Sequence, residues 1–131
     1  MTEPRGTPHY PRPASIDGYG KGGFSFAGMS HRGSLLCLPS GIWGWPVMQA
    51  SDIDEAALAP VFAEAQDIGL FLIGSGAGTG RSAWAMPDAL RLRFHELKIS
   101  VEVARTGTAV STYNILLGEG RRVAAALIAV D

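Results

Sequence analysis

The segment of this chain that most resembles a ligand-binding loop is rich in glycine and follows a short apolar run. It reads Gly74-Ser75-Gly76-Ala77-Gly78-Thr79-Gly80-Arg81. Such loops present backbone N–H groups to phosphates, so a contact with a ligand or partner is one interpretation. The spacing fits neither the dinucleotide fingerprint nor the P-loop, because Thr79 or Arg81 stands where these motifs require glycine. A structural turn is the other interpretation, and both stay open.

Nucleophilic and metal-ligating side chains form no recognisable pattern. Cys37 is the only cysteine and lies among leucines, which indicates a buried thiol and excludes an internal disulfide. His9, His31 and His95 have no metal-ligand spacing with one another or with the cysteine, so no metal site is expected. The sequence contains no Gly-x-Ser-x-Gly nucleophile elbow. We therefore expect no catalytic residues, no metal and no cofactor.

Hydrophobic periodicity in the first third of the chain indicates short strands. Phe24 and Phe26 alternate with small residues, and the apolar segments 34–38 and 42–47 lie on either side of a turn. We expect these segments to form a small N-terminal antiparallel β unit. Trp43 and Trp45 share one face of their strand, where they either pack in the core or contact a partner.

The second half of the chain alternates predicted strands with predicted helices. Residues 69–73, 99–103 and 123–130 are apolar runs of the kind found in buried strands. Helical patterns separate these runs, near 88–98 and from Thr106 or Thr108 to about residue 117. This alternation predicts an α/β unit with parallel pairing in at least part of its sheet.

Capping residues suggest where the helices begin. Ser51 or Asp52 can start a helix that Pro60 then bends or restarts, because proline does not fit deep inside a helix. Thr106 or Thr108 can cap the last helix through a side-chain hydroxyl.

Polar residues follow two of the predicted strands. If 70–73 and 99–103 are parallel, their carboxyl ends share the edge of the sheet at which open α/β folds bind ligands. The loop 74–81 and the segment 105–114 then face one crevice. Its candidate binding residues are Gly74, Ser75, Gly76, Gly80, Arg81, Arg105, Thr106, Thr108, Ser111, Tyr113 and Asn114. The alternative is that the hydroxyls only cap the helix and that Tyr113 and Asn114 hydrogen-bond inside the protein.

The composition restricts the class of function. The 131 residues include 11 Lys plus Arg and 12 Asp plus Glu, for a formal charge of −1. This balance argues against a dedicated nucleic-acid binder, which carries a basic face. The longest apolar run, 123–130, is far shorter than the ~20 residues of a membrane-spanning helix, and the N-terminus lacks a signal-peptide core. A cytoplasmic protein without membrane insertion is expected, and no oligomeric state is predicted.

The prolines indicate how the chain is divided. Residues 1–13 hold four of the eight prolines and no apolar periodicity, which predicts a flexible tail. Residues 14–131 are expected to form a single α/β domain, because hydrophobic residues make up 47% of the chain and suffice for a core.

Several segments together resemble a known family. They are TGTAVSTYNILL at 106–117 and EGRRVAAALI at 119–128, preceded in order by IDGYG at 16–20, GFSF at 23–26, LPSG at 38–41 and LIGSG at 72–76. The chain resembles a family of unknown function whose mitochondrial members are complex I (NADH dehydrogenase) assembly factors. Its animal relatives include an adipogenesis-associated protein. The resemblance covers roughly residues 15–130.

The resemblance implies a three-layer α/β fold with a mixed central sheet, and it implies no established enzymatic activity or cofactor. The leading hypothesis is therefore a non-catalytic protein that binds a protein partner or aids assembly, in relation to a respiratory complex. The second hypothesis is a small-molecule or anion-binding protein, or a weak enzyme, that uses the crevice between residues 74–81 and 105–114.

Overall fold

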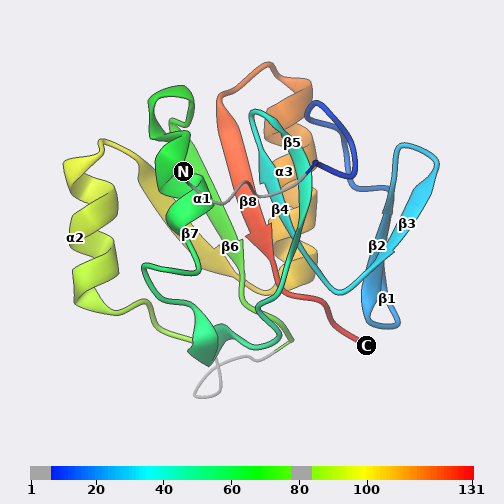
Figure 1. Ribbon diagram of the computed structural model, residues 1–131, viewed down its shortest axis with the longest axis horizontal. Coiled ribbons are helices and arrows are strands. Elements are labelled where there is room, and N and C mark those ends of the chain that lie inside the picture. The colour runs from blue at the N-terminus through cyan, green and yellow to red at the C-terminus, as the bar shows by residue number, and fades with distance from the viewer. Residues whose placement is uncertain (1–6, 78–83) are drawn as a thin grey trace.

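A five-stranded mixed sheet forms the centre of the computed structural model, which describes residues 7–77 and 84–131 (Figure 1). The strands are β4 (Ser34–Leu38), β5 (Gly41–Trp45), β6 (Leu70–Gly74), β7 (Ser100–Ala104) and β8 (Val123–Leu127). Their order across the sheet is β5-β4-β8-β6-β7. Strand β6 is parallel to β7 and β8, whereas β4 is antiparallel to β5 and β8. The predicted parallel pairing of 70–73 with 99–103 is confirmed.

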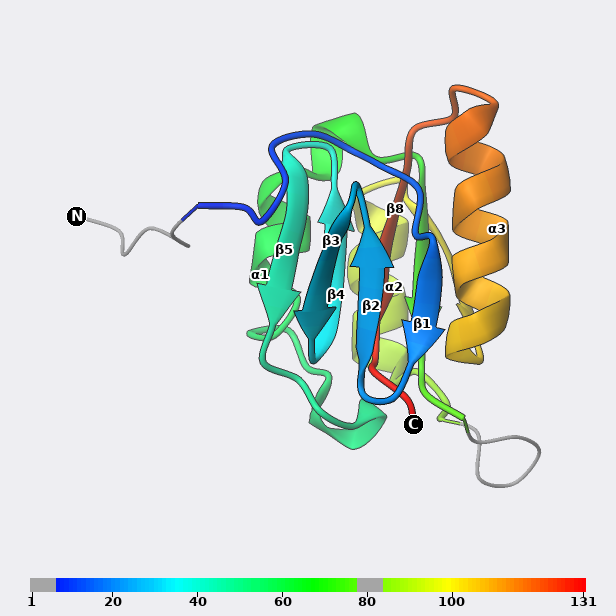
Figure 2. The same cartoon turned by 90° about the vertical axis from the view of Figure 1, so that its right-hand side faces the viewer.

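Each face of this sheet is covered by a different layer. The short helix α1 (Ala59–Ala63) and α2 (Asp88–Glu96) pack on one face, where Leu58, Val61 and Phe94 join a shared core. Helix α3 (Thr106–Gly118) and a second, smaller sheet pack on the other face (Figure 2). The predicted three-layer α/β arrangement with a mixed central sheet is therefore confirmed.

The smaller sheet consists of three antiparallel strands near the N-terminus: β1 (Gly18–Gly20), β2 (Gly23–Phe26) and β3 (Met29–Arg32). Phe24 and Phe26 of β2 are buried in the core beneath α3. A small N-terminal β unit is thus present, but it does not contain the segments 34–38 and 42–47. These join the central sheet, because β4 pairs with β8, a strand almost ninety positions further along the chain.

The helix start predicted at Ser51 or Asp52 differs from the structure. No long helix begins at Ser51: a 3₁₀ turn at Ala50–Asp52 precedes α1, and another at Ala65–Asp67 follows it. Pro60 lies in the first turn of α1, the helical position that tolerates the missing N–H.

Among the described residues, no helix combines the length and apolar character needed to span a membrane.

Part of the segment predicted as a flexible tail lies against β5. The Ile42 N–H donates to the Tyr10 carbonyl at 2.9 Å, and the His9 N–H donates to the Ile42 carbonyl at 2.8 Å. Gly41 permits this approach, because a Cβ at that position would collide with the Tyr10 carbonyl oxygen. Residues 8–12 therefore lie along the outer edge of the central sheet.

The hydroxyl of Thr106 joins three segments where the parallel strands end. Its side chain is fully buried, donates to the Ile128 carbonyl at 2.8 Å and accepts the Gly76 N–H at 3.0 Å. The Thr106 N–H in turn donates to the Gly76 carbonyl at 2.9 Å. The predicted capping role of Thr106 or Thr108 is wrong, because Arg105 is the N-cap residue and α3 has no side-chain cap.

A buried thiol and a buried phenol meet on the α3 side of the sheet. Cys37 and Tyr113 are 0% and 1% exposed, and the Tyr113 hydroxyl donates to the Cys37 sulfur. Burial raises the pKa of Cys37 to about 12 and raises the pKa of Tyr113 above its ordinary value. The prediction that the Cys37 thiol is buried is therefore confirmed.

The variant Thr106→Val tests the buried hydroxyl. Valine keeps the volume but leaves the Gly76 N–H and the Ile128 carbonyl without a partner, so we expect a loss of about 2–3 kcal/mol of unfolding free energy. Urea denaturation measures this loss. Thr108→Val is the matched control, because Thr108 is exposed on the same helix, and its stability should change by less than about 0.5 kcal/mol. Equal stability of the two variants would contradict the role of Thr106.

Cys37 predicts how stability depends on alkaline pH. The thiol has an ordinary pKa of 9.0 and a folded-state pKa of about 12. Below pH 9 both states keep the proton; above it only the unfolded state loses it, so the unfolding free energy falls as pH rises. From about pH 9 to about pH 10, the wild type should lose about 1 kcal/mol more than Cys37→Ala. Denaturant titrations across this range measure the difference, and parallel pH profiles would contradict it.

Candidate functional site

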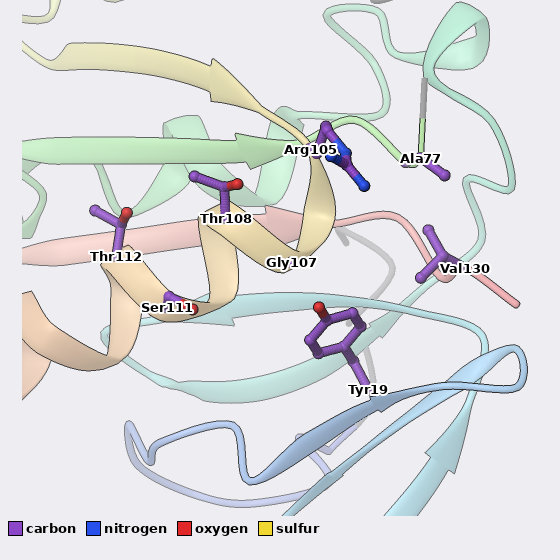
Figure 3. A pocket seen from close by; sticks show the side chains of 9 residues that line it. Tyr19, Ala77, Arg105, Gly107, Thr108, Ser111, Thr112 and Val130 are labelled. Atoms are coloured by element: carbon purple, nitrogen blue, oxygen red, sulfur yellow. The ribbon is translucent and has the colours of Figure 1, made fainter. Parts of the chain in front are cut away.

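A cavity of about 450 Å³ lies at the edge of the sheet where β6, β7 and β8 end (Figure 3). The segments that follow these three parallel strands contribute Gly76, Arg105 and Val130, respectively. The cavity, called here the Arg105 pocket, is lined by Tyr19, Gly76, Ala77, Arg105, Gly107, Thr108, Ser111, Thr112 and Val130. This is the edge at which ligands of open α/β sheets bind.

The first turn of α3 gives the Arg105 pocket a positive wall. The helix begins at Thr106, and the N–H groups of Gly107 and Thr108 have no hydrogen-bond acceptor among the residues that the structure describes. Free N–H groups at a helix start attract negative charge. The guanidinium of Arg105 adds a full positive charge, and the hydroxyls of Thr108 and Ser111 add hydrogen-bond donors.

Tyr19 closes the pocket from the smaller sheet. Its ring is 51% exposed, and its hydroxyl lies beside Gly107 at the start of α3 (Figure 3). A Cβ at position 107 would collide with that hydroxyl, so only glycine lets Tyr19 lie this close. The pocket therefore joins two layers: α3 forms one wall and the β1 strand of the smaller sheet forms another.

Four of the predicted crevice residues line the pocket together: Gly76, Arg105, Thr108 and Ser111. Five others do not: Gly74, Ser75, Thr106, Tyr113 and Asn114. Gly80 and Arg81 lie outside the described residues, so the structure places neither.

The five residues outside the lining have internal contacts. At Gly74 a Cβ would lie 3.0 Å from the Thr106 backbone, so this glycine allows close packing. The Ser75 hydroxyl donates to the Ala104 carbonyl at 3.2 Å. Asn114 pairs with the backbone of Ile16: its Oδ1 accepts the N–H and its Nδ2 donates to the carbonyl, both at 2.8 Å. Asn114 thus fastens the segment before β1 to α3.

Three further lining residues, Ala77, Gly107 and Thr112, lie inside the predicted segments 74–81 and 105–114 but were not named as candidates, and two, Tyr19 and Val130, lie outside both segments. The sequence contained a signal for Thr112: Ser111 and Thr112 lie three and four positions after Thr108, so all three share one face of a helix. No local pattern indicated Tyr19, since almost ninety residues separate it from Gly107 in the sequence.

The lining side chains suit binding better than catalysis. The described residues that line the pocket include no histidine, cysteine or carboxylate, so no base stands beside the hydroxyls to activate them. Within residues 7–77 and 84–131, no group of three or more His, Cys, Asp or Glu side chains gathers at one point. The chemistry that the pocket offers is recognition of an anionic group by positive charge and N–H or O–H donors.

The two tryptophans of β5 occupy different environments. Trp45 is 5% exposed, and its Nε1–H donates to the Ala57 carbonyl at 2.9 Å, so this residue belongs to the core. Trp43 is half-buried, and its Nε1–H donates to the Ser40 hydroxyl at 2.9 Å. Packing in the core therefore accounts for Trp45.

Relatives cover most of this chain. A protein of Rhodobacter capsulatus described as uncharacterized is 38% identical over 113 residues, which are 86% of this chain and 82% of that protein. The mouse (Mus musculus) protein named "NADH dehydrogenase [ubiquinone] 1 alpha subcomplex assembly factor 3" is 33% identical over 119 residues. This alignment covers 91% of the present chain but only 62% of the mouse protein.

A solved structure has the same fold. The crystal structure described as "an outer membrane protein from the Bartonella henselae" superposes with a TM-score of 0.87 at 43% identity. The match covers 94% of this chain and 100% of the other. Residues 16–128, which include all three layers and every described lining residue except Val130, also match a family model. The chain therefore belongs to the family described as "Protein of unknown function (DUF498/DUF598)".

Proposed function

We propose that this protein is a non-catalytic, assembly-factor-like protein that binds a protein partner and works in the cytoplasm. The observation that carries the proposal is the match of 91% of this chain to a mouse protein named as an assembly factor of NADH dehydrogenase. The proposed partner is accordingly a subunit of a respiratory NADH dehydrogenase. Sequence identity of 33% over 119 residues supports a shared binding surface within these residues.

The Arg105 pocket is the proposed contact for this partner. It presents one guanidinium, the free N–H groups of α3 and several hydroxyls at an open edge of the sheet. These groups complement an Asp or Glu side chain, because a carboxylate accepts hydrogen bonds from all of them and carries the opposite charge. An acidic side chain of the partner is therefore the proposed occupant, with Tyr19 packing against its stem.

A second candidate function follows from the size of the pocket. A cavity of about 450 Å³ falls in the range that holds small ligands, about 300–1,000 Å³. A free small carboxylate or phosphate offers the same chemistry as an acidic side chain. The second hypothesis, a small-molecule or anion-binding protein, is therefore kept for the same pocket.

Charge reversal at Arg105 tests partner binding. Tagged protein is purified from its native cells after cross-linking, and the captured proteins are identified by mass spectrometry. We expect an NADH dehydrogenase subunit, and Arg105→Glu should lower its affinity in a reconstituted binding assay by about tenfold or more, because like charges then meet. Arg91→Glu on α2 is the matched control, since Arg91 is exposed away from the pocket. Equal binding by both variants would refute the proposed contact.

Thermal melting of the isolated protein tests the second candidate. If a small anion occupies the pocket, a saturating carboxylate or phosphate should raise the melting temperature by several degrees, since a ligand at about 100 times its Kd adds about 2.7 kcal/mol. Arg105→Ala should abolish the shift, whereas Arg91→Ala should keep it. If no metabolite in a panel raises the melting temperature, and capture of the partner depends on Arg105, the results favour a protein partner.

A further inference from the structure

Two imidazoles from distant parts of the chain lie against each other beside the edge strand of the central sheet. His9 belongs to the segment along β5, and His31 belongs to β3 of the smaller sheet. Their ring centroids lie 4.6 Å apart, and the ring planes are tilted by 42°. The two residues are far apart in the sequence, so only the packing of the smaller sheet against β5 brings them together.

The edges of both rings lie over Gly44. A Cβ at position 44 would lie 3.1 Å from Nε2 of His9, 3.2 Å from Cε1 of His31 and 3.6 Å from Nε2 of His31. Nε2 of each ring therefore lies within 4 Å of the space above Gly44, and that space holds no side chain of residue 44. An ion about 2.0–2.1 Å from each nitrogen needs the two nitrogens about 3.3 Å apart, which the observed distance between the ring centroids allows.

The environment of His31 suits a metal ligand. Its imidazole is hydrogen-bonded to the Ser34 backbone, the kind of contact that fixes the ring orientation of metal-ligating histidines. Burial and the neighbouring His9 lower the pKa of His31, while the Ser34 contact opposes them.

We propose that His9 and His31 form a two-ligand site for a borderline transition-metal dication, Zn²⁺ or Cu²⁺, over Gly44. Imidazole nitrogens prefer these ions to Mg²⁺ and Ca²⁺, which take oxygen ligands. Within the described ranges no third His, Cys, Asp or Glu joins the pair, so water completes the coordination. The bound ion fastens residues 8–12 to β3 and β5, in addition to the hydrogen bonds between Tyr10 and Ile42.

This site is independent of the proposed partner contact. His9, His31 and Gly44 are absent from the lining of the Arg105 pocket. A protein that binds no metal can therefore still bind its partner, and a protein that binds no partner can still bind metal.

Metal titration of the full chain tests the site. Calorimetry with Zn²⁺ should show one equivalent bound, and Cu²⁺ should bind more tightly, as the order of divalent affinities requires. Mg²⁺ should give no signal. His9→Ala and His31→Ala should each lower the Zn²⁺ affinity by about tenfold or more, because one imidazole alone is a weak ligand. His95→Ala removes the remaining histidine, which lies on α2, and should leave the affinity unchanged.

Gly44→Ala is the sharpest variant, because it keeps both histidines. Its methyl group would lie 3.1 Å from Nε2 of His9 and 3.6 Å from Nε2 of His31, where it takes up space beside both nitrogens, so it should weaken Zn²⁺ binding as strongly as the loss of one imidazole. Gly118→Ala is the matched control: no atom lies within 4 Å of the added methyl, and binding should be unaffected. Melting curves without metal confirm that each variant folds. Wild-type binding retained in Gly44→Ala or His9→Ala, or no Zn²⁺ binding by the wild type, would overturn the proposal.

Discussion

The hydroxyl of Thr106 is the interaction on which the geometry of the candidate site depends. It lies where β6, β7 and β8 end, and it bonds the loop after β6 and the segment after β8 to the first turn of α3. A buried hydroxyl with one donor and one acceptor bond fixes both partners, since losing either leaves a buried polar group unpaired. The Thr106 hydroxyl therefore holds Gly76 close to the start of α3, next to Arg105. These two lining residues of the pocket are fixed relative to each other.

The smaller sheet connects the two sites proposed for this protein. Its register places Tyr19, Phe24 and His31 side by side across β1, β2 and β3, and directly opposed residues in antiparallel strands share one face. Phe24 is 4% exposed and anchors the row in the core. At one end of the row Tyr19 reaches the start of α3, and at the other His31 reaches β5. One row of side chains thus positions a residue for each site.

Local patterns predicted the parallel half of the fold well. The apolar runs ending at Ile73 and Val103 form neighbouring strands of the central sheet. A helix connects them, and strands connected in this way are normally parallel. This made the edge with Gly76, Arg105, Thr108 and Ser111 predictable. For Tyr113 and Asn114 the sequence left a place in the pocket and internal hydrogen bonds both open, because a helical residue can face either way, and the structure shows the internal contacts.

By itself, the sequence determined the fold class, the family and the edge of the sheet that carries the pocket, since these depend on periodicity and short motifs. Tertiary structure alone decided that β4 joins β8, that Tyr19 reaches Gly107, and that His9 meets His31 over Gly44. Within these contacts, His9 and His31 are 22 positions apart, and the pairs β4 with β8 and Tyr19 with Gly107 are separated by far more. Their energy comes from burying whole layers against one another, and no local pattern encodes which faces meet.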